Sequence, residues 1–362
     1  MKTILFVESG SGYGGSATCL ANLVQELDKN RFRPIVAYYS AGPGIDRIIQ
    51  AGTPTIRLTR GLRLFQLMSA IKSHAVDLVH ANNELYSHVP AVLAASWMRR
   101  PCLMHMRGIR KLTRMERWLA KRIRWFIVIS KAARRFYTDD GLPDERMETI
   151  YDGVDLSRFD RELDGGKVRS DFKLKPEHLV VGMVSRLVPK KGQREFLDAL
   201  AELAPDFPQM RGVIVGGDPS PEGLYLKELQ KKAADLGLSQ QVIFPGWRDD
   251  VPEVNASFDV AAQPTQYMEG LCAAVAEAMA AARPVVASNM GGIPELIADN
   301  ETGFLVQPGS AQALARSIRR LLRDAGLRRR LGEAGRDRIR RILDQSRTVR
   351  QVESIYTQLL EP

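Results

Sequence analysis

Short apolar runs rich in β-branched residues alternate with longer amphipathic stretches along the whole chain. In the first half, the apolar runs cover residues 3–8, 34–39, 76–80, 101–106 and 125–129. Such runs are typical of strands buried on both faces, and the helical patterns between them are typical of βαβ units. The pattern therefore predicts a parallel α/β sheet with helices on both of its faces.

The alternation stops at a polar stretch, residues 155–177, and then starts again. This stretch contains the glycine pair 165–166, where we expect a hinge. The strands expected after it cover residues 179–184, 212–216, 241–244, 258–263, 284–288 and 303–306. Each series has enough strands for its own sheet. We expect two doubly wound, Rossmann-like domains that face each other across a cleft, with ligands at the carboxyl ends of the strands.

The expected domains cover residues 1–160 and 161–340, and a C-terminal helix over 341–362 is a candidate to cross back to the first domain. A chain of 362 residues suits two domains. The three cysteines (19, 102 and 272) lack the spacing of a disulfide framework or a zinc site. The apolar core of the N-terminal segment is too short for a signal peptide, and no run is long enough to span a bilayer. These features predict a cytoplasmic protein.

The net charge of +10 is concentrated in two blocks. Residues 107–125 carry eight cationic side chains against Glu116, and residues 316–350 carry thirteen arginines against four acids. In the first block, apolar residues recur at helical spacing: Leu112, Met115, Trp118, Leu119 and Ile123. An ordinary helix with its apolar stripe in the core fits this pattern, and so does a helix on the inner face of an anionic membrane.

A glycine-rich stretch, GSGYGGS at residues 10–16, follows the first strand and precedes a helix. It satisfies the G-x-G-x-x-G pattern of dinucleotide-binding folds. However, the second strand ends without the acidic residue that an NAD site requires, which argues against NAD. Gly14 and Gly15 would still allow the backbone to approach an anion at the start of a helix. The alternative is that the glycines only form a tight turn.

Two further segments place charged groups at strand ends. In SRLVPKKG, Arg186 follows the end of a strand, and Lys190 and Lys191 precede a helix. These cations from one loop could bind a diphosphate. In EGLCAAVAEAMA, Glu269 and Glu277 lie eight residues apart. Eight residues of helix rise about 12 Å, roughly the distance from a sugar across a diphosphate to a ribose. Carboxylates at both ends could accept hydrogen bonds from hydroxyls.

Taken together, these segments resemble the retaining glycosyltransferases of family 4, which have the GT-B fold. The resemblance covers nearly the whole chain. It depends on the early glycine pair and, in the family's order, on SRLVPKKG, GWRDDV, EGLCAAVAEAMA, RPVVASNMGGIPELI and TGFLV.

The resemblance implies a role for each matching residue. Arg186 and Lys191 would bind the donor diphosphate, Glu277 the ribose hydroxyls, and Glu269 the donor sugar beside the reacting carbon. The backbone at Gly270, Leu271 and Cys272 would contact the sugar and phosphate. Gly15 would close on the diphosphate from the first domain. Arg248 is a candidate contact to the nucleobase.

Three positions differ from the family's pattern. The two glycines before Asp218 differ slightly from the family's usual glycine–aspartate–glycine order. The family histidine that touches the donor sugar falls on Arg107 here, with His105 two residues earlier, and either residue could take that role. The family's Asn-Gly-Val-Asp signature reads Asp152-Gly153-Val154-Asp155.

The predicted function is therefore the transfer of a sugar, with retention of anomeric configuration, in cell-envelope or polysaccharide biosynthesis. The donor would be a UDP- or GDP-sugar, with UDP slightly favoured, and the acceptor a glycan, a lipid-linked molecule or a small molecule. We expect the donor in the second domain and the acceptor mostly in the first, along segments such as 80–88 and 107–118. No aspartate pair with one residue between occurs, so we expect no metal, and no other cofactor. Alternatives are a sugar-nucleotide epimerase or a phosphorylase on the same scaffold. A non-enzymatic nucleic-acid-binding protein is less well supported, because no sequence-specific motif accompanies the arginines.

Overall fold

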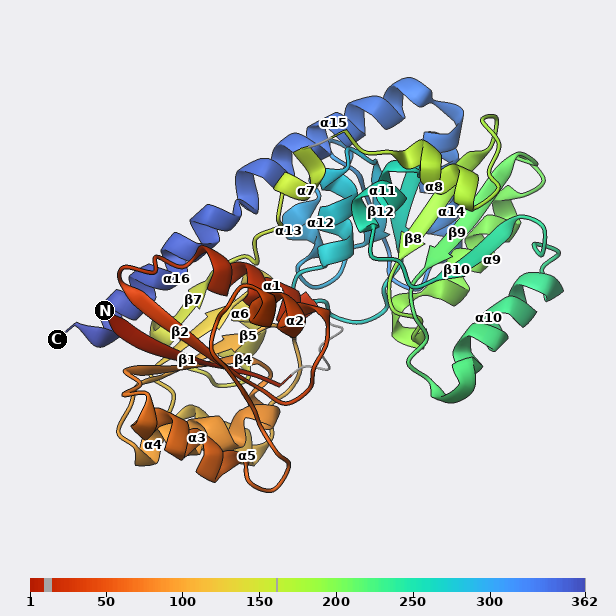
Figure 1. Ribbon diagram of the computed structural model, residues 1–362. Helices are drawn as coiled ribbons and strands as arrows, with labels where there is room; N and C mark the ends of the chain where they lie inside the picture. Colours follow the sequence, from red (N-terminus) through yellow and green to blue (C-terminus); the bar gives the residue numbers. More distant parts are fainter. Residues whose placement is uncertain (10–14, 161, 362) are drawn as a thin grey trace. The chain divides into compact units, whose positions relative to one another are not determined.

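The computed structural model describes residues 1–9, 15–160 and 162–361. The chain forms two compact units: unit 1 contains Met1–Val154 and the chain from Leu343 onward, and unit 2 contains Asp155–Ile342. The boundary expected at residue 160 therefore lies inside unit 2. The last helix, α16 (Gln345–Leu360), belongs to unit 1 (Figure 1).

The hinge expected at the glycine pair 165–166 is not there. Both glycines belong to the first turn of α8 (Gly165–Asp171), inside unit 2. A Cβ atom at Gly165 would lie 2.7 Å from the carbonyl carbon of Ala256, in α11 (Val251–Ala256). The glycine is needed for close packing between two helices.

Unit 1 contains a seven-stranded sheet in the order β3-β2-β1-β4-β5-β6-β7, with neighbouring strands parallel. Its strands are β1 (Lys2–Glu8), β2 (Phe32–Tyr38), β3 (Thr55–Arg57), β4 (Leu78–Asn83), β5 (Cys102–Met106), β6 (Trp125–Val128) and β7 (Met147–Thr149). The expected strands are all present. The sequence pattern missed β3 and β7, which have three residues each and lie at the two edges.

Helices cover both faces of this sheet, because alternate residues of the central strands point to opposite sides. Leu5 and Val7 of β1 belong to one core, and Ile4 and Phe6 belong to the other. The helices are α1 (Gly15–Glu26), α2 (Pro43–Gln50), α3 (Arg63–Ser73), α4 (Val89–Trp97), α5 (Arg114–Ala120) and α6 (Lys131–Asp139), with 3-10 turns η1 (Leu85–His88) and η2 (Asp144–Arg146). Helices α3 and α4 lie on the Leu5 side, whereas α1 and α16 lie on the Ile4 side (Figure 1).

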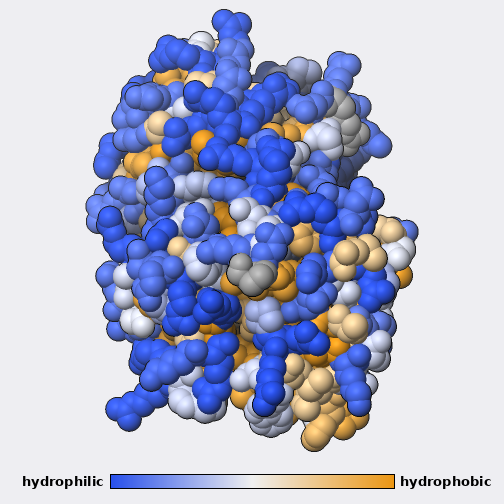
Figure 2. All heavy atoms as spheres, turned by 90° about the vertical axis from the view of Figure 1, so that its left-hand side faces the viewer, coloured by the Kyte–Doolittle hydropathy of each residue, from blue (hydrophilic) through white to orange (hydrophobic). Residues whose placement is uncertain are grey.

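The helix expected in the block 107–125 is shorter than its apolar pattern. Helix α5 begins after a capping box formed by Thr113 and Glu116 and ends at Ala120. Leu112, Leu119 and Ile123 are buried, but Met115 is 55% exposed and Trp118 is 49% exposed. The lower part of Figure 2, which holds the layer of α3, α4 and α5, shows hydrophobic side chains reaching the surface between hydrophilic ones.

Unit 2 contains a six-stranded parallel sheet in the order β10-β9-β8-β11-β12-β13. Its strands are β8 (Leu179–Val184), β9 (Met210–Val215), β10 (Val242–Gly246), β11 (Val260–Gln263), β12 (Val285–Ser288) and β13 (Phe304–Val306). The remaining helices are α7 (Ser157–Asp160), α9 (Gln193–Leu203), α10 (Leu224–Asp235), α12 (Ala273–Ala280), α13 (Ile293–Leu296), α14 (Ala311–Arg323) and α15 (Ala325–Ile342), with 3-10 turns η3 (Pro189–Lys191) and η4 (Pro221–Gly223). Two doubly wound α/β units confirm the predicted fold class.

Candidate active site

Each sheet has a point where the strand order reverses, and ligands of doubly wound folds bind beyond the strand ends at that point. In unit 2 the order reverses between β8 and β11. The loop after β8 carries Arg186, Lys190 and Lys191, and the loop after β11 carries Glu269. Residues 78 positions apart in the sequence are thereby brought together.

Lys191 and Glu269 form a buried ion pair between these two loops. The Nζ of Lys191 donates to Oε1 of Glu269, and the two side chains are 13% and 10% exposed. The hydroxyl of Tyr267 donates to the other carboxylate oxygen at 2.8 Å. Burial lowers the pKa of Lys191, but the neighbouring Cys272 and Glu269 outweigh this effect and raise it. Lys191 is therefore a permanent cation in a site with little water.

A glycine turn after β12 holds the backbone of Glu269. The N–H of Gly292 donates to the Glu269 carbonyl at 2.9 Å. Gly291 has a φ of 59°, and a Cβ atom there would lie 2.2 Å from the same carbonyl oxygen. Only glycine fits this position. The position of Glu269 therefore depends on three loops, after β8, β11 and β12.

Helix α12 begins at Ala273, four residues after Glu269, so the interval from Glu269 to Glu277 is only partly helical. The 12 Å expected from a continuous helix does not apply. Gly270, Leu271 and Cys272 form the segment that leads into the first turn, with Cys272 as the N-cap. The Cys272 side chain is buried and makes no capping hydrogen bond. This segment offers backbone N–H groups at a helix start, where anions bind favourably.

Glu277 lies within α12 and is half-buried. Burial raises its pKa to about 7, although the positive charge of Arg158 acts in the opposite direction. Among the residues that the structure describes, no hydrogen bond or ion pair to the Glu277 carboxylate is found. A carboxyl group that is desolvated without partners is poised to accept hydrogen bonds from a ligand.

The two arginines assigned to the donor differ in their surroundings. Arg186 is exposed, and its side chain has no polar partner within the described parts of the chain. Its carbonyl accepts a hydrogen bond from Gln193 at 2.9 Å, which fixes the loop. The guanidinium of Arg248, in contrast, is shared between Asp250 and Asp171. Arg248 therefore holds the loop after β10 to α8, and any ligand contact would compete with two carboxylates.

In unit 1 the strand order reverses between β1 and β4, and a buried polar network lies at this end of the sheet. The Glu8 carboxylate, which is fully buried, accepts hydrogen bonds from Asn82 and, at 3.4 Å, from Ser16. Ser16 follows Gly15 in the first turn of α1. Gly15 thus lies beside the strand ends, as the sequence predicts, whereas Gly14 lies outside the described residues.

Arg107 continues this network from the end of β5. Its guanidinium donates to Asp152 and to Asn82, the latter at 2.9 Å, and its side chain is 5% exposed. His105 is buried, with Nδ1 3.5 Å from Arg107. Burial and the positive charge of Arg107 hold the pKa of His105 well below its ordinary value, so its imidazole is neutral. Arg107 is the member of the pair closer to the surface, and His105 lies behind it.

Sequence reasoning missed several members of these clusters. Tyr267 and Thr265 flank Glu269, and Glu8, Asn82 and Asp152 surround Arg107. Glu8 carried a usable signal, because it is an acid at the last position of an otherwise apolar strand. Asp152 begins the segment that matches a family signature, but its contact with Arg107, like that of Asn82, depends on which strands become neighbours.

Most arginines of the second basic block, 316–350, contact groups within unit 2. Arg338 donates to the Leu296 carbonyl at 2.7 Å, and Arg328 donates to the Leu321 carbonyl at 2.8 Å. These cations satisfy carbonyl groups at helix ends. In the parts of the chain that the structure covers, no helix is both long and apolar enough to cross a bilayer.

Comparison with known proteins identifies the family of the chain and supports its fold. The family model "Glycosyltransferase Family 4" matches residues 13–158, and "Glycosyl transferases group 1" matches residues 166–338. HepE of Anabaena, solved in complex with UDP and with UDP-glucose, is a similar structure. Its UDP complex has a TM-score of 0.89 and 27% identity, and the match covers 99% of this chain and 100% of that one.

Curated relatives match over a shorter range. A GDP-mannose-dependent phosphatidylinositol monomannoside mannosyltransferase of Mycolicibacterium smegmatis is 34% identical over 217 residues, 58% of this chain and 55% of the relative. A D-inositol 3-phosphate glycosyltransferase of Streptomyces bingchenggensis is 30% identical over 280 residues, 71% of this chain and 61% of the relative. The chain thus spans little more than half the length of these relatives. With one glycosyltransferase model on each unit, it belongs to glycosyltransferase family 4 and has the GT-B fold.

Proposed function

We propose that the protein transfers a sugar from a nucleotide-diphosphate-sugar to a hydroxylated acceptor, with retention of anomeric configuration. The observation that carries this proposal is the ion pair of Lys191 and Glu269 at the reversal point of the unit 2 sheet. A permanent cation suits a diphosphate, and a carboxylate beside it suits sugar hydroxyls. A donor that contains both a diphosphate and a sugar would fit the cation and the carboxylate at once.

In this proposal the enzyme stabilises the departing nucleotide diphosphate. Lys191, Arg186 and the backbone N–H groups before α12 would meet the negative charge that develops as the bond to the sugar breaks. Because Glu269 is held by Lys191 and Tyr267, it would contact sugar hydroxyls rather than attack the anomeric carbon. Retention would then follow from attack on the same face, with the leaving phosphate accepting the proton of the acceptor hydroxyl.

Glu277 would accept hydrogen bonds from the ribose hydroxyls. These bonds would replace the hydrogen bonds to water that the carboxylate loses on burial. In unit 1, we assign Arg107 to the donor sugar and Gly15 to the diphosphate. In this proposal the cations above provide the positive charge, without a metal ion.

Relatives support a nucleotide-sugar donor but differ in its base. HepE was solved with UDP-glucose, and the M. smegmatis relative is named for GDP-mannose. The test is turnover of a panel that contains UDP-glucose, UDP-galactose, UDP-N-acetylglucosamine and GDP-mannose, followed by release of the nucleotide. We expect one donor to be hydrolysed or transferred, with activity lost in Glu269→Gln. A protein that releases nucleotide from none of them is not this transferase.

We also propose that α5 contacts an anionic membrane surface, which suits a lipid-linked acceptor. Met115 and Trp118 are exposed, and Arg122 lies over the Trp118 ring at 3.5 Å. Arg114 and Lys121 are exposed beside them. Exposed apolar side chains among cations are typical of helices that lie in a membrane interface. A soluble glycan remains the alternative acceptor.

A further inference from the structure

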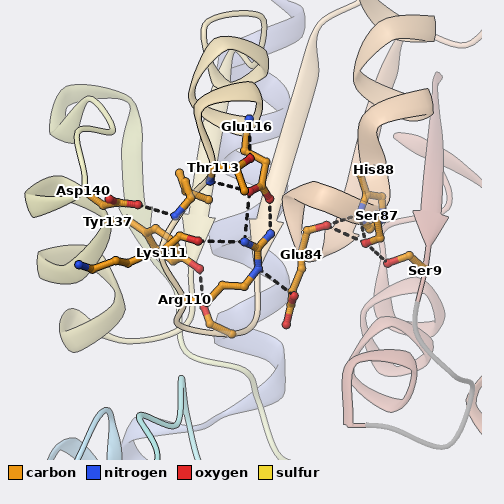
Figure 3. Close-up of polar contacts among 12 residues, drawn as sticks. Ser9, Glu84, Ser87, His88, Arg110, Lys111, Thr113, Glu116, Tyr137 and Asp140 are labelled. Atoms are coloured by element: carbon orange, nitrogen blue, oxygen red, sulfur yellow. Dashed lines mark hydrogen bonds and ion pairs between the residues drawn. The ribbon is translucent and has the colours of Figure 1, made fainter.

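The end of β4 in unit 1 carries a second cluster that the donor roles leave unused. Arg110 lies between two carboxylates: its Nε donates to Glu84 at 3.1 Å, and its terminal nitrogens donate to Glu116 (Figure 3). The guanidinium also lies 4.8 Å from the centre of the Tyr86 ring. Glu84 and Tyr86 both follow β4, at the strand ends where the sheet order reverses.

We propose that Tyr86 and Glu84 form an acceptor platform for a neutral, hydroxyl-bearing ring, a sugar or a polyol. The inference deepens the proposed transferase function and depends on it. Tyr86 is 57% exposed, so its ring is accessible to a ligand at the reversal point of the sheet. The face of an aromatic ring attracts the polarised C–H groups of a sugar. Arg110 beside the ring limits its motion.

Glu84 adds a hydrogen-bond acceptor next to this ring. Its Oε2 is held by Arg110, whereas Oε1 has no hydrogen-bond partner in the described parts of the chain. Oε1 lies 3.1 Å from where a Cβ of Gly108 would be, so the glycine leaves room beside the carboxylate. A half-exposed carboxylate oxygen with a fixed partner is suited to accept a hydroxyl proton.

The charge of the cluster selects against a phosphate at this position. Arg110 carries one positive charge, and Glu84 and Glu116 carry two negative charges, so the three groups together are negative. The interaction with Arg110 and the first turn of α5 outweighs burial and lowers the pKa of Glu116, which keeps it ionised. A phosphate group placed on the platform would meet an arginine that is already neutralised. The ring bound here is therefore expected to be neutral.

Several contacts hold the backbone of the platform in place. Asn83, directly before Glu84, has a φ of 123°, a conformation that costs free energy and is kept only where surrounding contacts enforce it. The Glu84 carbonyl accepts hydrogen bonds from Ser87 and His88, both at 2.8 Å, and Ser87 also contacts Ser9 after β1 (Figure 3). A fixed platform lowers the entropy lost on binding.

Saturation-transfer NMR on the full chain tests the platform without relying on turnover. The probes are methyl α-glucoside, methyl α-mannoside, methyl α-galactoside and myo-inositol, with D-inositol 3-phosphate as the phosphorylated probe. We expect at least one neutral probe to bind, with Tyr86→Ala raising its Kd about ten-fold. Tyr86→Phe keeps the ring and should bind as the parent does.

Trp97→Ala is the matched control. Trp97 is 59% exposed and ends α4, shortly before the start of β5, so it lies toward the opposite end of the parallel strands from Tyr86. Thermal melting checks that the variants are folded. The inference is overturned if no neutral probe binds, if Tyr86→Ala binds as tightly as the parent, or if only the inositol phosphate binds. Failure of the transferase proposal would appear separately, as the absence of nucleotide release from any donor.

Discussion

Lys191 and Glu269 form a buried ion pair that joins the loop after β8 to the loop after β11. Each side chain is the other's main charge partner, and both lie at the point where a diphosphate and a sugar are proposed to bind. In the absence of a donor, the pair keeps two charges satisfied in a site with little water. A donor would let each group bind a ligand of matching chemistry while their mutual contact persists.

Lys191→Ala should lower kcat/KM for the donor about 100-fold, because it removes a cation from the developing negative charge. It should also destabilise the fold by about 3 kcal/mol, since Glu269 is left charged and nearly buried. Adding Glu269→Gln should restore most of the stability but none of the activity. Steady-state kinetics and urea unfolding measure the two effects.

The neighbouring Lys190 is the control for this prediction. Lys190 is exposed, and its Nζ lies 4.2 Å from the centre of the Tyr267 ring. Lys190→Ala removes the same charge from the same loop, so it should change kcat/KM much less. Equal losses in the two variants would mean that the loop acts only through its net charge.

Glu277 should make donor binding depend on pH around 7. Its pKa is raised from an ordinary value of 4.5 to about 7, so the folded protein holds a proton that the unfolded chain loses between these values. Folding stability from this group is therefore greatest below the unfolded pKa and falls as the pH rises toward 7. Ribose binding needs the carboxylate, so donor affinity should rise as the pH rises through 7.

Glu277→Gln tests both trends. The amide does not titrate, so the variant should bind donor about ten-fold more weakly above pH 7 and with a flat pH profile. The measurements are the donor KM and the free energy of unfolding of parent and variant, each at pH values below and above 7. A parent and a variant with the same pH profile would remove Glu277 from the ribose role.

Gly291→Ala should abolish donor turnover, because its new methyl group would collide with the Glu269 carbonyl and move that side chain. Gly309→Ala is the matched control. Gly309 also has a positive φ, 76°, but nothing lies within 4 Å of a Cβ atom there. Both variants should lose about 1 kcal/mol of stability from the left-handed backbone. Activity lost equally in both would show that backbone strain, not the position of Glu269, is responsible.

The exposed part of α5 makes a prediction about membrane binding. Arg114→Gln combined with Lys121→Gln should weaken binding to phosphatidylglycerol vesicles about ten-fold or more. Arg110 and Arg117 are unsuitable for this test, because they are paired with Glu116 and Asp140. Vesicle sedimentation is the measurement.

The control for the vesicle experiment carries the same charge change elsewhere. Lys175→Gln combined with Lys227→Gln removes two exposed cations from unit 2, neither of which has an ion-pair partner in the described parts of the chain. This control should sediment as the parent does. If both double variants lose binding to the same extent, only net charge matters and α5 is an ordinary surface helix.

Local patterns in the sequence predicted most of the fold. Apolar runs such as that of β1 are buried on both faces, so their signal does not depend on neighbours, whereas the three-residue edge strands β3 and β7 have too little pattern to detect. Met115 and Trp118 lie inside α5 and fit the helical spacing of the block 107–125, yet they are exposed, whereas Leu112 and Ile123 lie outside the helix and are buried. Helical spacing in this block therefore did not predict which apolar residues reach the core.

The candidate site was predictable only in part, for a related reason. Strand ends place Lys191 and Glu269 at one edge of a sheet, but only the strand order, with β8 beside β11, makes them partners. The pairing of Arg248 with two acids was likewise not visible, because Asp171 lies far away in the sequence. The residue types indicate the chemistry of the site, but the order of the strands determines which residues become neighbours.

A crystal structure of the protein with an intact nucleotide sugar tests the central claim most directly. We predict that the diphosphate lies within hydrogen-bonding distance of Lys191 and Arg186, with a sugar on Glu269 and the ribose on Glu277. A donor bound with its diphosphate away from Lys191, or with its ribose away from Glu277, would contradict the account.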